Sequence, residues 1–171
     1  MRRTMEVAGL MMLGILFWIT YAALNGPERL PLRIPTHFDI SGQPNAWGSP
    51  QMLWLLPLIG TGLYLLMTIL ASIRFRRYNL PVRVTEGNLP FIQGKTGEMV
   101  AWIKFELLAL FSYIQWSIVQ GARAGEFHLS PAIVPVSLAL ILVTVGWYLA
   151  AIIRGAKART ESPDSVTHVQ N

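Results

Sequence analysis

The sequence predicts an all-α fold: a polytopic bundle of four transmembrane helices with an ordered, proline-rich extracytoplasmic loop. The composition, the grouping of the apolar residues and the distribution of the basic residues all point to it. Of the 171 residues, 53% are hydrophobic and 13% are charged. An average soluble domain is about one-quarter charged, so this chain has few residues with which to cover a soluble surface. A disordered chain is also excluded, because disorder needs low hydrophobicity and high charge.

The apolar residues gather in four runs without charge. These runs cover residues 7–24, 52–73, 107–122 and 132–153. A helix needs about 20 apolar residues to cross about 30 Å of hydrocarbon, and the shortest run reaches that length when its charged start is included. We therefore expect spans at about 5–24, 52–73, 99–121 and 132–153. The first is expected to be a retained helix, since a cleaved signal peptide has a shorter apolar core.

The basic residues divide unequally between the two sides of such a bundle. One side has only Arg29, Arg33 and Arg123. The other side has Arg2, Arg3, Arg74, Arg76, Arg77, Arg83, Lys95, Lys104, Arg154, Lys157 and Arg159. Short loops rich in Lys and Arg stay in the cytoplasm, so both termini are predicted to be cytoplasmic. The net charge of +5 is explained by this topology, and we expect no nucleic-acid partner.

The loop at residues 25–50 is unusual in its composition. Its five prolines exclude a helix and favour extended backbone; they are Pro27, Pro31, Pro35, Pro44 and Pro50. The sequence Asp39-Ile-Ser-Gly42 predicts a turn that starts at the aspartate and ends at a glycine free to adopt positive φ. Ile34, Phe38 and Trp47 are apolar anchors. We expect an ordered cap over the outer end of the bundle.

Two stretches of this loop carry a resemblance to a known family. They are Leu-Pro-Leu-Arg-Ile-Pro-Thr-His-Phe at 30–38 and Ser-Gly-Gln-Pro-Asn-Ala-Trp-Gly-Ser at 41–49. They resemble DUF1648, a bacterial membrane-domain family of unknown function that also forms the N-terminal part of SdpI-type immunity and signalling proteins. Asn45 stands where that family usually has aspartate. The resemblance implies a short, four-span protein of the bacterial cytoplasmic membrane with an outward-facing, histidine-containing loop.

The loop is also the first candidate site. Its expected recognition residues are Ile34, Pro35, His37, Phe38, Gly42, Asn45 and Trp47. Two histidines and several carboxylates on the same side could in principle bind Zn²⁺, which accepts N and O ligands; they are His37, His128, Glu28, Asp39 and Glu126. The alternative is a structural His37 whose ring bonds the loop's own backbone. We rank the structural alternative first and expect no cofactor.

Three polar residues within the predicted spans form a second group of candidates. We expect Lys104 to extend its ammonium to the headgroups and Gln115 to hydrogen-bond to another helix. Glu106 lies deeper, where an ionisable residue is by default a functional hypothesis. Its alternative role is an interfacial carboxylate paired with Lys or Arg from a neighbouring helix end. Regular helix is not expected between residue 74 and about residue 96, and the tail 154–171 is expected to be disordered.

These features favour a non-enzymatic membrane protein. The chain has no cysteine and no H-E-x-x-H, G-x-S-x-G or P-loop pattern. We expect the outer loop to recognise a peptide, a lipid or a partner membrane protein, with the bilayer as the constant partner and a homo-oligomer as a further alternative. A subunit of a transport or export complex is the competing hypothesis, in which Glu106 would line the path.

Overall fold

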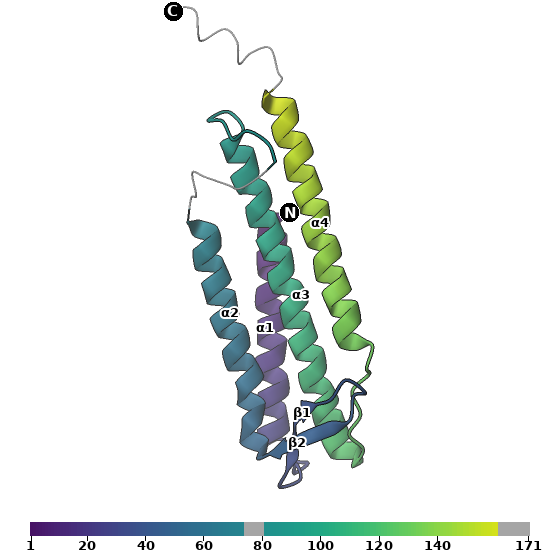
Figure 1. The fold of residues 1–171 in the computed structure, drawn as a ribbon. Coiled ribbons are helices and arrows are strands. Elements are labelled where there is room, and N and C mark those ends of the chain that lie inside the picture. The colour runs from purple at the N-terminus through teal and green to yellow at the C-terminus, as the bar shows by residue number, and fades with distance from the viewer. Residues whose placement is uncertain (74–80, 161–171) are drawn as a thin grey trace, which may run out of the picture.

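A computed structural model describes residues 1–73 and 81–160 and shows a bundle of four α-helices with a short β-hairpin at one end (Figure 1). The helices are α1 (Arg2–Asn25), α2 (Leu55–Ser72), α3 (Leu89–Ala124) and α4 (Ile133–Thr160). The hairpin consists of β1 (Ile34–Phe38) and β2 (Pro44–Gly48), and the 3-10 helix η1 (Pro50–Trp54) connects it to α2. The predicted all-α class is confirmed.

Helix α3 is the central element of the bundle. It packs against α1, α2 and α4, whereas α4 makes its main helix contacts with α3 alone. The hairpin, η1 and the connection between α3 and α4 lie together at one end, which we call the hairpin end (Figure 1). The start of α1, the end of α2, the start of α3 and the end of α4 lie toward the opposite end. Each of the four helices therefore runs between the two ends of the bundle.

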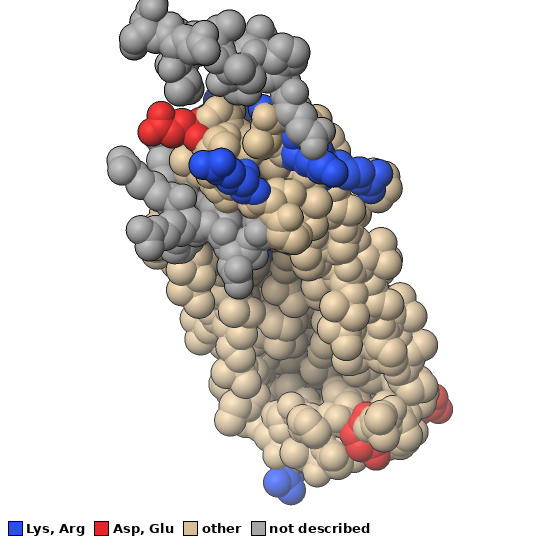
Figure 2. Space-filling view, turned by 45° about the horizontal axis from the view of Figure 1, so that its top comes forward, with Lys and Arg blue, Asp and Glu red and all other residues tan. Residues whose placement is uncertain are grey.

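Three segments of the described chain are long and apolar enough to cross a membrane. They are Arg2–Asn25, Pro50–Ser72 and Ile133–Thr160. Their outward side chains are large and apolar, such as Leu66, Leu142 and Trp147. Figure 2 shows Lys and Arg gathered toward the end opposite the hairpin and a wide band without charge between the two ends. The protein is therefore a membrane protein, and the span assigned to the more polar α3 stays a prediction.

Helix α3 begins earlier than the sequence predicted. The expected irregular segment up to about residue 96 is wrong over 89–96, because the helix starts at Leu89 with Pro90 in its first turn. Proline is tolerated there, since the first N–H groups of a helix have no intrahelical acceptor. The buried Asn88 fixes this start: its amide donates to the Arg83 carbonyl (2.9 Å) and to Thr160 Oγ1 on α4 (3.1 Å). Arg74, Arg76 and Arg77 lie outside the described residues.

Helix α4 continues beyond the predicted span. A disordered tail from residue 154 is wrong over 154–160, which form the last two turns of α4. Ile152 and Ala156 are buried there against Ile92 of α3, and this apolar contact explains why the helix persists. Residues 161–171 lie outside the described residues.

Candidate functional site

The turn of the hairpin is built around one carboxylate. Asp39 Oδ1 accepts hydrogen bonds from Ser41 N (2.9 Å), Ser41 Oγ (2.6 Å) and Gln43 N (3.0 Å). These bonds, first the one from the Ser41 hydroxyl, stabilise the ionised form and hold the pKa of Asp39 below its usual value. Gly42 closes the turn with a φ of 79°, a conformation that favours glycine. The turn predicted at Asp39–Gly42 is present.

The tip of the hairpin docks on the connection between α3 and α4. Leu129 N donates to the Gly42 carbonyl (3.0 Å), and the Gln43 amide lies 3.1 Å from His128 Nδ1. A Cβ atom on Gly42 would lie 1.8 Å from the Leu129 carbonyl oxygen. The two backbones therefore approach as closely as a glycine permits. The predicted loop is an ordered cap.

Apolar side chains attach the same hairpin to the bundle. Ile34 is 1% exposed and packs in a cluster with Ala23 of α1, Leu53 of η1 and Ile118 of α3. Trp47 contacts Phe127 edge to face, with ring centroids 5.2 Å apart, yet 43% of Trp47 stays exposed. Ile34 is thus a buried anchor, whereas Trp47 also presents a surface.

His37 faces outward and is bonded within the hairpin. Its Nδ1 lies 2.5 Å from Asn45 Oδ1 on β2, next to an irregularity in the register where His37 pairs with Ala46. A carbonyl oxygen only accepts, so with this assignment of the amide the imidazole donates from Nδ1. The expected bond from His37 to the loop's backbone is therefore replaced by a side-chain bond to Asn45.

The proposed zinc ligands do not come together. No group of three or more His, Asp or Glu side chains that could hold a metal ion occurs within residues 1–73 and 81–160. Glu28 instead pairs with Arg123 (2.9 Å), Asp39 holds the turn and His128 contacts Gln43. These residues lie toward the same end of the bundle, but Glu28, Asp39 and His128 are engaged in separate local contacts.

A cavity of about 110 Å³ lies between the hairpin and the helices. Ile34, Pro35 and Phe38 of β1 form one wall; Leu53 and neighbouring residues of η1 and α2 form another. Gln115, with Ile114 and Ile118, contributes the wall from α3. Three of the predicted recognition residues and one predicted intramembrane residue therefore line the same space. We take this cavity as the candidate functional site.

Gln115 is 1% exposed and links three segments beside this cavity. Its Nε2 donates to Thr20 Oγ1 on α1 (2.7 Å) and to the Leu53 carbonyl of η1 (2.8 Å). Because the Leu53 carbonyl only accepts, the group beside it must be Nε2, and the positions of Nε2 and Oε1 cannot be exchanged. Oε1 then stays buried with no hydrogen-bond donor among the described residues. The prediction that Gln115 bonds to another helix is confirmed.

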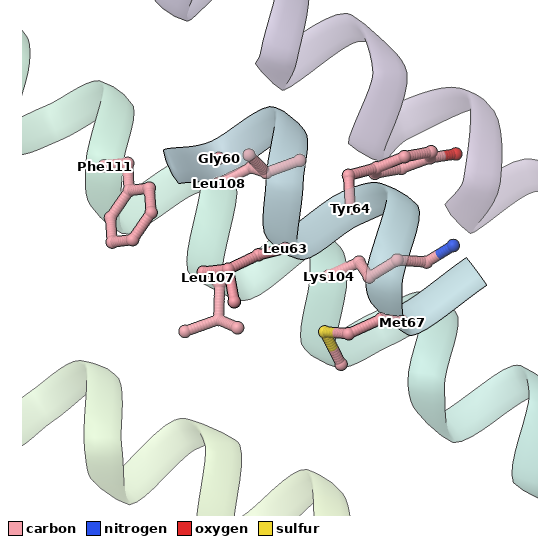
Figure 3. A pocket seen from close by; sticks show the side chains of 8 residues that line it. All are labelled: Gly60, Leu63, Tyr64, Met67, Lys104, Leu107, Leu108 and Phe111. Carbon is pink, nitrogen blue, oxygen red and sulfur yellow. The ribbon is translucent and has the colours of Figure 1, made fainter. Parts of the chain in front are cut away.

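Lys104 belongs to a separate polar cluster between the helices; Figure 3 shows its ammonium beside Tyr64. Its Nζ lies 2.5 Å from Glu6 Oε2, 2.9 Å from Thr68 Oγ1 and 4.2 Å from the centre of the Tyr64 ring. The Tyr64 hydroxyl donates to the same Glu6 oxygen (2.8 Å). Lys104 is 1% exposed, so the expectation that it extends to the headgroups is wrong. The ammonium is instead held by α1 and α2.

The adjoining cavity leaves little room for a ligand. Its volume is about 10 Å³, and a single water molecule needs roughly this much. Figure 3 shows the Lys104 ammonium beside Tyr64 and directed away from Leu107 and Phe111, which line the other half of the cavity. This cluster therefore joins helices and offers no binding space.

Glu106 faces α4. Its Oε1 accepts a hydrogen bond from Thr144 Oγ1 (2.6 Å), and its Oε2 is buried with no donor in the described part of the chain. The expected Lys or Arg partner is wrong for the described residues, among which the Thr144 hydroxyl is the hydrogen-bond donor to this carboxylate. Glu106 is only two positions from Lys104 in the sequence, but residues two positions apart on a helix lie about 200° apart around its axis, so the two side chains face different neighbours.

The comparison with family models matches residues 11–61 to a family described as "Domain of unknown function (DUF1648)". Residues 11–61 are a DUF1648-type domain. The matched residues 11–61 contain the whole hairpin and two of the three cavity walls, those from β1 and from η1 with α2, whereas the wall that includes Gln115 comes from outside them. Neither the comparison with curated proteins nor the comparison with solved structures found a match.

The sequence reasoning missed the partners Glu6, Thr20 and Thr144. Glu6 could have been predicted as a partner, since it is the only charged residue of the predicted span 5–24 and a single acidic residue in a span needs a partner. Thr20 and Thr144 could not have been predicted, because threonine is common in membrane helices. Their roles depend on which helices become neighbours.

Proposed function

We propose that this protein is a non-enzymatic membrane protein that recognises a partner through its hairpin cap. The observation that carries the proposal is the cavity between the hairpin and the bundle. Binding sites are typically concave and apolar, with a few polar groups that set orientation. This cavity has apolar walls from Ile34, Phe38 and Ile118, with Thr36 and Gln115 as its polar members.

A peptide or a segment of a partner membrane protein fits this end better than a lipid does. The sheet has only the strands β1 and β2, so each has an outer edge that pairs with no other strand of the described chain. An extended peptide can add to such an edge and place a side chain in a neighbouring pocket. Leu32 and Ile40, which are 91% and 97% exposed, supply apolar contacts beside that edge.

We further propose that the hairpin end faces outward from a bacterial cytoplasmic membrane, with both termini inside. The excess of Lys and Arg at the opposite end supports this orientation. The chain lacks cysteine, so a single introduced cysteine is the only thiol of the protein that can be labelled. Ile40→Cys and Glu126→Cys should react with an impermeant thiol reagent in intact cells, and Ala158→Cys only after lysis. Labelling of Ala158→Cys in intact cells would contradict the topology.

Photo-crosslinking tests the recognition proposal. A benzophenone amino acid at Thr36, which lines the cavity, should give a discrete protein or peptide adduct in cells that need the protein. Met52→Trp should fill the cavity from its edge and abolish that adduct, whereas Met11→Trp, on the exposed face of α1, should not. Persistence of the adduct in Met52→Trp, or lipid adducts alone, would show that the cavity is not the recognition site.

The second candidate function is a subunit of a transport or export complex. It is favoured by one observation: Glu6, Lys104 and Glu106 lie inside the bundle, and intramembrane ionisable residues commonly mark transport paths. If this function is correct, Lys104→Met with Glu6→Leu should abolish the cellular phenotype while the hairpin variants retain it. Recognition through the cap predicts the reverse.

A further inference from the structure

A groove between α3 and α4 is separate from the hairpin cavity. Its volume is about 230 Å³, and its walls are mainly apolar: Phe105, Ala109 and Tyr113 come from α3, and Leu140 comes from α4. Leu140 is 56% exposed, so the groove borders the outer surface of the helices. A molecule dissolved in the hydrocarbon can reach it without passing through the bundle.

Glu106 gives this apolar groove a charge. It lines the groove, and its Oε2 is buried with no hydrogen-bond donor among the described residues. Thr144 donates to the other oxygen (2.6 Å) and so holds the carboxylate in place on the α4 side. Thr144 lies about 16 Å along α4 from its first residue, well inside a hydrocarbon layer about 30 Å thick. A carboxylate at that depth is costly without a partner.

The cations in the described part of the chain cannot supply that partner. Lys104 points to the other side of α3, where Glu6 and Thr68 bind it. The remaining Lys and Arg of the described helices lie near their ends, as Arg2, Lys95 and Arg154 do. The groove thus combines an uncompensated carboxylate with two aromatic side chains that line it, Phe105 and Tyr113.

We propose that the α3–α4 groove binds a small lipophilic organic cation, with Glu106 as its counter-ion. An organic cation matches the apolar walls, the carboxylate and the aromatic rings of the groove. Its apolar body fills the groove, its charge faces the carboxylate, and aromatic rings within about 6 Å of a cation add further attraction. A neutral lipid chain would leave Glu106 without a partner, and an anion would be repelled.

The test uses the full chain in detergent, with tetraphenylphosphonium as the probe and tetraphenylborate as an anion of nearly the same shape. Equilibrium dialysis, corrected for micelles without protein, should show saturable binding of the cation and none of the anion. Glu106→Gln keeps an acceptor for Thr144 but removes the charge, and it should weaken binding at least tenfold. Glu126→Gln removes the same charge from the exposed connection and should leave binding unchanged.

A steric pair tests the groove independently of the charge. Ala109→Phe should fill the groove and abolish binding, whereas Ala139→Phe on the exposed face of α4 should not; this pair decides the matter if Glu106→Gln fails to fold. Equal binding of cation and anion would overturn the proposal, as would a Kd for Glu106→Gln within twofold of the wild type. So would a dimer that Ala109→Phe dissociates without any cation binding, because a second copy would then occupy the groove.

Discussion

Replacing Gly42 with alanine tests the docking of the hairpin most severely. The new Cβ would lie 1.8 Å from the Leu129 carbonyl oxygen, and the φ of 79° is unfavourable for alanine. A left-handed conformation costs roughly 1–2 kcal/mol for a residue with a side chain. Separation of the backbones also removes the bond from Leu129 N to the Gly42 carbonyl, worth about 1 kcal/mol. We expect Gly42→Ala to weaken docking by about 2–3 kcal/mol, on the order of 100-fold in the opening equilibrium.

Hydrogen exchange of the Leu129 amide measures that opening directly, because this N–H donates to the Gly42 carbonyl across the contact (3.0 Å). It should exchange on the order of 100-fold faster in Gly42→Ala. Gly146→Ala is the matched control, because a Cβ on Gly146 meets no atom within 4 Å; the Leu129 amide should exchange there as in the wild type. Unchanged exchange in Gly42→Ala would refute the docked arrangement of the two backbones.

Three further substitutions have distinct expected results. Lys104→Met should lower the free energy of unfolding in detergent by about 2 kcal/mol, because the half-buried Glu6 loses its charged hydrogen-bond partner and keeps only the Tyr64 hydroxyl and Arg2, and Lys104→Met with Glu6→Leu should recover part of the loss; a double variant less stable than the single would contradict a mainly electrostatic pair. The pKa of Asp39 is lower in the fold than in the unfolded chain, so its stabilisation is complete above the unfolded value and is lost as pH falls below about 4. The protection of the hairpin amides, measured against their intrinsic exchange rate at each pH, should therefore fall in acid, and Asp39→Asn should remove that fall; an equal fall in both proteins would exclude the carboxylate. His37→Gln should preserve abundance but abolish the cellular phenotype if the exposed ring contacts a partner; an unchanged phenotype would assign recognition to the shape of the loop.

The sequence predicted the helices and the cap better than the contacts within them. Apolar runs of the right length are a property of each segment alone, and so is the Asp39–Gly42 turn. The strands were not predicted, because five-residue strands that contain Pro35 and Pro44 have little of the usual strand signature. Pro90 indicated a break, but proline at the start of a helix is equally consistent with the sequence.

The polar site residues depended on long-range packing. Lys104 and Glu6 are 98 positions apart, and a lysine in a span looks the same whether it reaches the headgroups or a carboxylate on another helix. Gln115 was predicted to bond across helices because a buried amide requires partners, although those partners could not be named. The cavity beside it could not be predicted, since its walls come from β1, η1, α2 and α3.

The hairpin forms a cap docked on the end of the bundle, and a cross-link between its tip and the α3–α4 connection reports whether the two are in contact in the cell. Gln43 Nε2 and His128 Nδ1 lie 3.1 Å apart, so Gln43→Cys with His128→Cys should be joined rapidly by a short impermeant bis-methanethiosulfonate added to intact cells. Gln43→Cys with Ala158→Cys places the two thiols at opposite ends of the bundle, so no cross-link between them should form. Rapid linkage in the first pair alone is the predicted result; linkage no faster than in the second pair would contradict the cap.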